Sequence, residues 1–334
     1  MRIVALVLKR LAWFAPTLVG LLLVVFIISH IIPANPAIML AGEGASEAQI
    51  NEIKRKFGLD QPLPVQFWRY LQSVVQGDMG TSLYTQRPIA EDLLTRVPAT
   101  LELTLITIVI AAVLGIPLGV IAATRRNSML DHVLRIFTVS GLAIASFWLA
   151  ILFQLMFAMK LGWTPLQGRV DGWGPDHVTG FFLIDALIQG DGEILSNVAS
   201  HLVLPVATLA FPAMATIVRF TRAGVLDAIN SNYVLYEQAM GLPRHVIIWK
   251  YVLRNALIGT VTQIGLIFGI LLAGAVVVES VFDWPGLGLY AVNSIMRSDY
   301  NGTMGFTLIT GAIFIVVNLF VDIVHGIIDP RGAG

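Results

Sequence analysis

Starting at Arg219, the sequence reads RFTRAGVLDAINSNYVLYEQAMGLPRHVIIWKYVLRNALIGTV, a polar and aromatic segment between two apolar runs. Ser231 or Asn232 offers a helix N-cap, because the side-chain oxygen of either residue accepts a hydrogen bond from a free backbone N–H of the first turn. Gly241 suits the left-handed conformation that ends a helix, and Pro243 blocks its continuation. The segment therefore predicts a short helix between the two caps, flanked by two longer helices.

The composition excludes an ordinary soluble domain. Of the 334 residues, 56% are hydrophobic and 13% are charged, whereas soluble domains carry about a quarter charged residues. Much of the surface is therefore expected to face lipid. The net charge of zero gives no overall attraction to nucleic acid. The chain has no cysteine, which excludes disulfides, thiolate metal sites and cysteine nucleophiles.

Six apolar runs have about the 20 residues that a helix needs to cross a membrane. They predict an all-α polytopic membrane protein with six transmembrane helices. Pro205 and Pro212 interrupt the fourth run, which a membrane helix tolerates when its neighbours satisfy the freed carbonyl groups. The first run is too long for a signal peptide and lacks a cleavage site, so we expect it to be retained. The runs cover residues 11–32, 99–123, 133–158, 202–218, 257–281 and 306–328.

Basic residues set the expected orientation, because they gather on the cytoplasmic side of a membrane. With both termini in the cytoplasm, the inner segments hold most of them, including Arg125, Arg135 and Arg222. A second external segment, 159–200, is expected to form an irregular lid. The chain then divides into residues 1–32 (N-terminal tip and first span), 33–98 (a periplasmic loop domain), 99–328 (a core of spans two to six, with the cytoplasmic loop 219–256) and 329–334 (a cytoplasmic tail).

The short helix of the cytoplasmic loop has two interpretations. A helix that lies across the membrane face between two spans offers a rigid apolar and aromatic surface to a partner. Because both of its ends are fixed, a force on this helix moves the spans. A plain connecting turn explains the same spacing equally well, so docking and connection both remain open on spacing alone.

Several pieces of the sequence resemble a known family. Gly241-Leu242, followed by LRNAL at 253–257, resembles the coupling loop of ABC-importer permeases, and more narrowly that of the oligopeptide/dipeptide/nickel family. Other matches follow in the family's order along nearly the whole chain. The long external loop near the N-terminus is typical of the first of the two membrane subunits. The other matches are LDQPLPVQ (59–66), GDMGTS (77–82), RVPATLEL (96–103), ESVFDWPGLG (279–288) and DPR (329–331).

The resemblance implies a type I ABC-importer permease in the bacterial inner membrane. Such a permease pairs with a homologous second permease, binds two cytoplasmic ATPase subunits and receives substrate from a periplasmic binding protein. The chain itself is then no enzyme and holds no cofactor; ATP and Mg²⁺ belong to the ATPases, and no Walker A sequence occurs here. The ATPase-coupling helix is expected to use Asn232, Tyr233, Tyr236, Glu237, Ala239, Gly241 and Leu242.

The substrate is the least defined part of this expectation. Di- or oligopeptides are expected from the resemblance, while nickel, glutathione and other small solutes remain open. A secondary transporter is the alternative class, which ATP-independent uptake would reveal. Three positions before the helix end also depart from the family's pattern: Leu235 and Met240 stand where basic residues are common, and Glu237 where alanine is common. The expected docking surface is therefore less basic than in the family.

Small residues at four-residue spacing let helix backbones approach closely. Gly115 and Gly119 form one such pair, which we expect to pack within the subunit. Gly265, Gly269 and Ala273 form a longer ridge. This ridge suits packing within the subunit and contact with the partner permease along the pathway equally well.

Three acidic residues lie in or near the apolar runs, where an ionisable side chain needs a partner or marks a pathway. Glu102 and Glu279 fall close to the outer ends of their spans, where we expect water to reach them. Asp322 lies deeper in the sixth span. It either pairs with a buried polar group or, with Gly265 and Gly269, lines the pathway.

Overall fold

The computed structural model describes the chain except for residues 1, 32–45, 57–59, 177 and 329–334. Most of the described residues are helical, and the only β feature among them is an isolated antiparallel bridge between Thr81 and Pro88. The predicted all-α class is confirmed. In chain order the elements are α1 (Arg2–Ile31), α3 (Glu47–Lys56), α4 (Leu63–Val75), α5 (Ile89–Thr124), α6 (Met129–Ala143), α7 (Ser146–Phe153), the π-helix η1 (Gln154–Lys160), α8 (Phe182–Gln189), α9 (Gly192–Ile229), α10 (Asn232–Ala239), α11 (Arg244–Val246), the π-helix η2 (Ile247–Val252), α12 (Leu253–Val281), α13 (Leu287–Met296) and α14 (Tyr300–Ile328).

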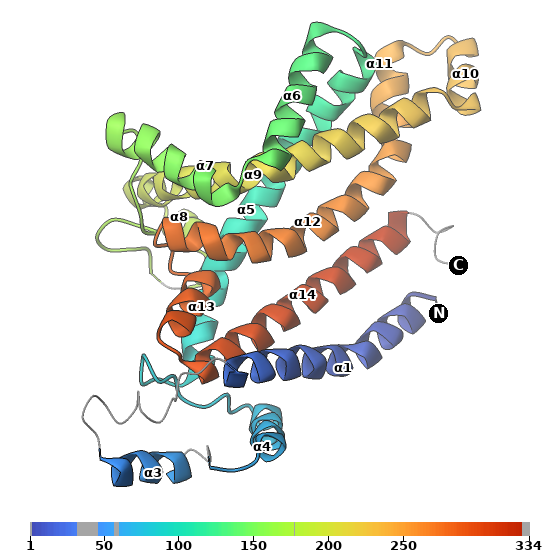
Figure 1. The fold of residues 1–334 in the computed structure, drawn as a ribbon. Coiled ribbons are helices and arrows are strands. Elements are labelled where there is room, and N and C mark those ends of the chain that lie inside the picture. Colours follow the sequence, from blue (N-terminus) through green and yellow to red (C-terminus); the bar gives the residue numbers. More distant parts are fainter. Residues whose placement is uncertain (1, 32–45, 57–59, 177, 329–334) are drawn as a thin grey trace.

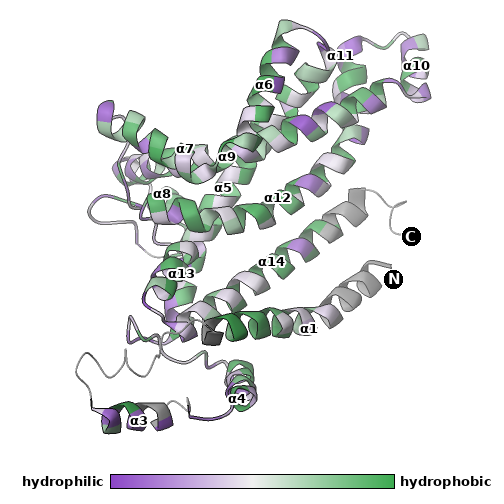
Figure 2. Ribbon diagram, viewed as in Figure 1, coloured by the Kyte–Doolittle hydropathy of each residue, from purple (hydrophilic) through white to green (hydrophobic). Residues whose placement is uncertain are grey.

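The described helices provide four, or at most five, of the six predicted spans, and the first span stays a prediction. Four stretches are long and apolar enough to cross a membrane: α5, α9, α14 and the continuous run from α11 through η2 to α12. α6 and the run from α7 to η1 make a fifth span when they are taken together, and α1 contributes an apolar stretch, Trp13–Ile28. Figure 2 shows hydrophobic residues along α7, α12 and the described part of α1, and hydrophilic residues on α3.

The molecule has two distinct ends (Figure 1). α10 lies at one end, and α13, α4 and α3 lie at the other. α1 and α14 run side by side in opposite directions, and both have their outer termini on the side of α10. We refer to these as the α10 end and the α13 end of the bundle.

The third predicted span, 133–158, is not one straight helix. α6 and the run that follows it meet at an angle of 104°. The bend lies at Ile144 and Ala145, whose ψ angles of 126° and 132° are extended rather than helical. No proline marks this position, so the even hydrophobicity of the run hid the break.

The fourth span begins earlier than the predicted residue 202. α9 starts at Gly192, where the Asp191 side chain accepts hydrogen bonds from the backbone N–H groups of Glu193 (2.8 Å) and Ile194 (3.2 Å). A carboxylate at this position also suits the positive end of the helix dipole. The hydropathy pattern identified only the apolar middle of a helix whose first turns are polar.

α9 is the centre of the bundle and packs against α5, α6 and α12. Gly115 and Gly119 of α5 face α9: an added Cβ at Gly115 would lie 2.9 Å from Ile217, and one at Gly119 would lie 2.6 Å from Thr221. The missing side chains at both positions therefore permit the close approach of the two helices. The predicted packing of this pair within the subunit is confirmed.

The second small-residue ridge faces α14 of the same chain. An added Cβ at Gly265 would meet Val321, and one at Gly269 would meet Phe314. Ala273, the third member of the ridge, is exposed. The contacts of the two glycines therefore agree with the first of the two predicted uses of this ridge, packing within the chain.

The segments at the α13 end are tied to the spans. Phe67 of α4 lies against Phe26 of α1, with ring centroids 5.2 Å apart. α3 starts after Ser46, whose hydroxyl accepts a hydrogen bond from the Gln49 N–H (3.4 Å), while the Gln49 side chain accepts one from the Ser46 N–H (2.9 Å). This reciprocal pair is a capping box, so Ser46 caps this helix.

We expect Gly119→Leu to destabilise the subunit, because its side chain must enter space that Thr221 already fills. Overpacking of this kind costs about 1–3 kcal/mol. The measurement is the melting temperature of the purified protein in mild detergent. Gly20→Leu is the control, since an added Cβ at Gly20 meets nothing within 4 Å. Equal melting temperatures for the two variants would contradict the packing of α5 on α9.

Candidate functional site

Backbone geometry defines both ends of α10. Ser231 occupies the N-cap position in an extended conformation, but its hydroxyl donates to the Asp227 carbonyl (3.4 Å) and makes no cap bond, which corrects the expected side-chain cap. At the other end Gly241 has a φ of 77°, and the Leu242 N–H donates back to the Glu237 carbonyl (3.3 Å). The short helix and its left-handed ending are as predicted.

One face of α10 is anchored in the bundle. Val234 is 2% exposed and packs into a hydrophobic cluster whose other members come from α5, α9, η2 and α12. Tyr233 and Leu242 pack against the same cluster. A force on α10 therefore reaches the long helices through buried side chains.

The opposite face of α10 is exposed and apolar. Leu235, Tyr236 and Met240 are 63%, 64% and 65% exposed, and Trp249 of η2 is half exposed. We call the first three the apolar face of α10. Of the residues predicted for the coupling helix, Asn232, Tyr236, Ala239 and Gly241 are exposed, and Tyr233, Glu237 and Leu242 are partly buried.

Leu235 and Met240 are missing from the predicted set because they replace basic residues of the family's pattern. Their spacing along the helix relative to Tyr236 could have indicated that they belong to the same exposed surface. Met240 follows Tyr236 by four positions, so the two side chains lie on the same side of the helix. The structure therefore extends the candidate surface by two apolar residues.

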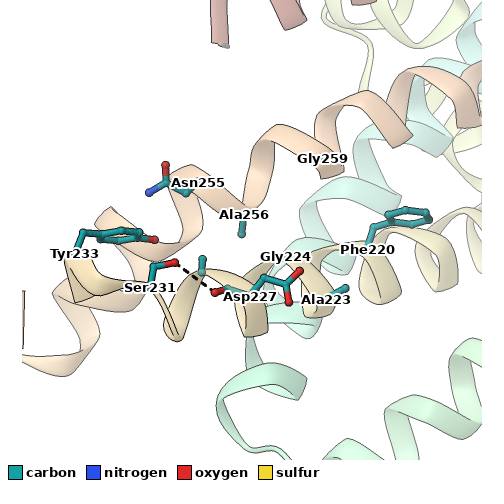
Figure 3. A pocket seen from close by; sticks show the side chains of 10 residues that line it. Phe220, Ala223, Gly224, Asp227, Ser231, Tyr233, Asn255, Ala256 and Gly259 are labelled. Carbon is teal, nitrogen blue, oxygen red and sulfur yellow. Dashed lines mark hydrogen bonds between the residues drawn. The ribbon is translucent and has the colours of Figure 1, made fainter. Parts of the chain in front are cut away.

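A groove of about 580 Å³ opens beside α10, between the facing sides of α9 and α12. Figure 3 shows Asp227 on α9 and Asn255 on α12 at its edges. Its floor is made of small residues: an added Cβ at Gly224 would lie 3.0 Å from the Ala256 carbonyl oxygen, so the two helices touch there. No pattern in the sequence indicates this groove. Its lining residues are Phe220, Ala223, Gly224, Asp227, Ala228, Ser231, Tyr233, Asn255, Ala256 and Gly259.

A buried carboxylate joins α6 to α9 on the α10 side of the bundle. Asp131 has no exposed surface, and its oxygens accept hydrogen bonds from Arg222 Nε (2.8 Å) and Nη2 (3.1 Å). Arg135 Nη2 (2.9 Å) and the Asn127 N–H (3.0 Å) bind the same carboxylate. In the sequence, the four-residue spacing of Asp131 and Arg135 is compatible with a pair on one helix, but nothing there points to Arg222, 91 positions away, as a second partner.

A second buried pair lies toward the α13 end. Glu102 of α5 binds Arg169 Nε (3.1 Å) and Nη2 (2.5 Å), and its other oxygen accepts the Leu183 N–H (2.7 Å). The guanidinium also lies 3.7 Å from the ring centre of Phe182. Burial lowers the pKa of Arg169, and the Glu102 carboxylate counteracts this change. Glu102 is buried and paired, so the expectation that water reaches it is wrong.

α8 and the loop before it cover this pair. The buried Asp185 accepts hydrogen bonds from the Thr179 hydroxyl (2.7 Å), the Thr179 N–H (2.9 Å) and the Gly180 N–H (3.0 Å). Burial raises the pKa of Asp185, but these hydrogen bonds outweigh it and hold the pKa below its usual value. The segment 159–200 is thus partly helical, because it includes α8 and the first turns of α9.

Glu279 ties α12 to α5 and α13. Its carboxylate accepts hydrogen bonds from the Thr100 hydroxyl (2.7 Å) and from the backbone N–H groups of Gly288 (2.6 Å) and Leu289 (3.2 Å). An added Cβ at Gly286 or Gly288 would meet this carboxylate. The two glycines of the WPGLG sequence are therefore required by the buried side chain beneath them. Glu279 has no exposed surface, so its predicted access to water is also wrong.

The three residues predicted for packing or a pathway are not gathered into one site. Gly265 and Gly269 face α14, as described above. Asp322 follows Val321, which contacts Gly265, but the Asp322 side chain lies outside the described residues. A role for these three residues in a pathway therefore stays a prediction.

Comparison with known proteins identifies the class. Residues 115–333 match the family described as "Binding-protein-dependent transport system inner membrane component", and residues 3–104 match the N-terminal family of the same systems. The bundle of apolar helices, the buried charge clusters and α10 are thus the parts of a transport subunit. The chain belongs to this family and is a permease subunit of a binding-protein-dependent ABC importer. It is a transport component rather than an enzyme.

The relatives agree over nearly their whole length. The "Probable D,D-dipeptide transport system permease protein" of Escherichia coli is 43% identical and aligns over 97% of this chain and 96% of its own. The dipeptide permease of Alkalihalophilus pseudofirmus is 37% identical over 97% of both chains. The glutathione permease of Pectobacterium atrosepticum is 36% identical over 96% of both.

A solved structure shares the fold. A chain of the MetNI methionine ABC transporter in an inward-facing conformation superposes with a TM-score of 0.50 at 17% identity, and the match covers 69% of this chain and 93% of that one. The likeness supports the helical arrangement described above.

We expect Arg169→Met to destabilise the protein strongly, because it leaves the Glu102 carboxylate buried without its cation. Loss of one partner from a buried pair costs about 3–5 kcal/mol. The measurement is the melting temperature in detergent. The double variant Glu102→Gln/Arg169→Met removes both charges and should recover part of the loss. An equal loss in the single and double variants would show that the unpaired charge is not the cause.

Proposed function

We propose that this permease carries di- or oligopeptides into the cell as the first of two homologous membrane subunits, and that α10 is the helix through which an ATPase drives it. The apolar face of α10, fixed to the bundle through Val234, is the observation that carries the coupling role. The peptide substrate is supported by relatives that are named as D,D-dipeptide, dipeptide and di/tripeptide permeases.

The chemistry of α10 favours docking into an apolar cleft. Leu235, Tyr236 and Met240 carry no charge, and their side chains are exposed on the surface of the bundle. Large aromatic residues often act as anchors of protein interfaces, which makes Tyr236 the central candidate. Because the basic residues of the family's pattern are replaced here, contact with the ATPase rests on burial of apolar surface more than on ion pairs.

The ATPase partners supply ATP and Mg²⁺ in this proposal, and the permease supplies the moving helices. A ligand shifts a protein between two states only by binding one of them more tightly. ATP bound between two ATPase subunits would therefore favour the state in which the two coupling helices lie closer together. α10 transmits that preference to α5, α9 and α12 through the cluster around Val234.

The proposed orientation places the α10 end in the cytoplasm. Arg219, Arg222, Lys250 and Arg254 lie in the elements that lead to and from α10, as the positive-inside rule expects. Both chain termini are then cytoplasmic, since α1 starts and α14 ends on this side (Figure 1). α3, α4, α8 and α13 face outward in this orientation, where a periplasmic binding protein delivers the substrate.

Glutathione or another small solute is the alternative cargo. It is favoured by the glutathione permeases among the relatives, at 36% identity. The D,D-dipeptide permease is 43% identical to this chain, but the dipeptide permeases at 37% are hardly more similar to it than the glutathione permeases, so similarity alone does not separate the two substrates. The distinction needs a direct measurement on the assembled importer.

We expect Tyr236→Ala to weaken binding of the ATPase subunit by about tenfold or more, the effect of losing an interface anchor. Because Tyr236 is exposed, the folding of the permease should be unchanged. The measurement is the affinity of purified ATPase for the permease pair in nanodiscs, at low and high salt. Gln238→Ala is the control, since Gln238 is an exposed polar residue of the same helix.

Wild-type affinity in the Tyr236→Ala permease would remove α10 from the interface. A steep loss of affinity with added salt in the unmodified complex would show that docking depends on charge instead.

For the cargo, we expect the importer that co-purifies with this chain to contain a second permease, two ATPase copies and a binding protein that carries peptide masses in native mass spectrometry. In proteoliposomes, an unlabelled dipeptide should compete with labelled dipeptide uptake more strongly than glutathione does. The reverse order of competition would assign glutathione as the substrate. This chain purified alone in an active preparation would contradict the assembly.

A further inference from the structure

The Asp131–Arg222 contact is the only ion pair that links two helices in the described part of the chain. Arg222 uses Nε and Nη2, at 2.8 Å and 3.1 Å, to bind the two different oxygens of the carboxylate. Such a bidentate pair fixes the orientation of both side chains as well as their separation. The contact therefore sets how α6 lies on α9.

Arg222 lies on a straight path to α10. From Arg222, α9 continues without a break to Ile229, and α10 starts at Asn232. Pro205 and Pro212, the prolines of α9, both precede this part, so it lacks the usual cause of a helix kink. A helix of this length spans only about 10 Å. A displacement of α10 is thus expected to move Arg222 by a similar amount.

On the other side, Asp131 lies in the first turn of α6 and also binds the backbone of the turn before it, through the Asn127 N–H. Farther along α6, Phe137 meets Phe211 with ring centroids 4.9 Å apart. An added Cβ at Gly141 would lie 2.7 Å from the Ala215 Cβ. α6 therefore follows α9 along its length, by charge at the α10 side and by packing beyond it.

We propose that the Asp131–Arg222 pair is a positioning element that makes α6 move together with the α10 end of α9 during transport. This inference rests on the proposed coupling role of α10. Apolar packing has little directional preference, so by itself it fixes the register of α6 on α9 less tightly than a bidentate ion pair does. The ion pair permits one register only, and it thereby passes the movement of α9 to α6 and to the bend that leads into α7.

Arg135 provides a matched control within the same cluster. It binds the same Asp131 oxygen at 2.9 Å, but from α6 itself. It therefore contributes charge to the cluster without connecting two helices. A role in charge balance alone would be shared by Arg135, whereas a role in positioning α6 on α9 depends on Arg222.

The experiment compares Arg222→Gln and Arg135→Gln in the complete importer, reconstituted with its partner permease, ATPases and binding protein. The measured quantity is the amount of dipeptide transported per ATP hydrolysed. We expect this ratio to fall about fivefold or more in Arg222→Gln, the lower range of ordinary coupling between sites. In Arg135→Gln it should stay within about twofold of the unmodified importer. Arg222→Lys keeps the charge without the bidentate geometry and should give an intermediate ratio.

A distance measurement tests the movement directly. The chain has no cysteine, so cysteines introduced at Val133 of α6 and at Asn230 after α9 are the only sites for spin labels in it. The partner subunits are prepared without cysteine as well. Both positions are exposed. We expect the distance between the labels to be equal without nucleotide and with bound ATP in the unmodified importer, and to change on ATP binding in Arg222→Gln.

An unchanged transport ratio in Arg222→Gln, or an equal fall in Arg135→Gln, would overturn the positioning role. If Arg222→Gln fails to assemble, Arg222→Lys is tested instead, by the transport ratio and the label distance. The positioning role is overturned if both quantities in Arg222→Lys equal those of the unmodified importer. Failure of the coupling role of α10 is distinguishable, because Tyr236→Ala would then leave binding of the ATPase unchanged. With that role intact and the ion pair irrelevant, Tyr236→Ala weakens binding while Arg222→Gln behaves like the unmodified importer.

Discussion

A carboxylate buried inside a helical bundle must be supplied with partners by the protein itself, because water does not reach it there. Asp131, Glu102 and Glu279 all meet this requirement through groups from other elements. Each one therefore dictates which elements lie together: α6 with α9, α5 with the loop before α8, and α12 with α5 and α13. Much of the helix arrangement follows from satisfying these three side chains.

The clusters are distributed unequally along the bundle. Glu102 and Glu279 unite α5, α8, α12 and α13 in one block at the α13 end, where glycines at 286 and 288 leave room for a carboxylate. Toward α10 there is a single ionic link, and a groove separates the exposed sides of α9 and α12. In the described residues, two of the three buried carboxylate clusters thus lie far from the helix on which an ATPase is proposed to act.

The features that depend on neighbouring residues could be predicted from the sequence. A span needs a long apolar stretch, so hydropathy found the four or five spans that the described helices provide. Gly241 with Pro243 was enough to define the end of α10. Features that depend on distant residues were missed. Glu102 and Arg169 are 67 positions apart, so nothing local marks them as a pair, and Glu102 was expected in water. The break at Ile144 has no proline to reveal it, and the first turns of α9 mix polar and apolar residues, so their mean hydropathy is too low to mark a span.

The bend between α6 and α7 bears on how the chain enters the membrane during synthesis. α6 has 15 residues and is therefore only about 22 Å long, which is short of the roughly 30 Å of hydrocarbon that a span must cross. By itself α6 therefore crosses only part of the hydrocarbon, and the bend places the rest of residues 133–158 in α7 and η1. α9, whose surface receives Phe137 and Gly141, is made later. The packing of α6 on α9 is accordingly completed only after α6 and α7 have both been synthesised.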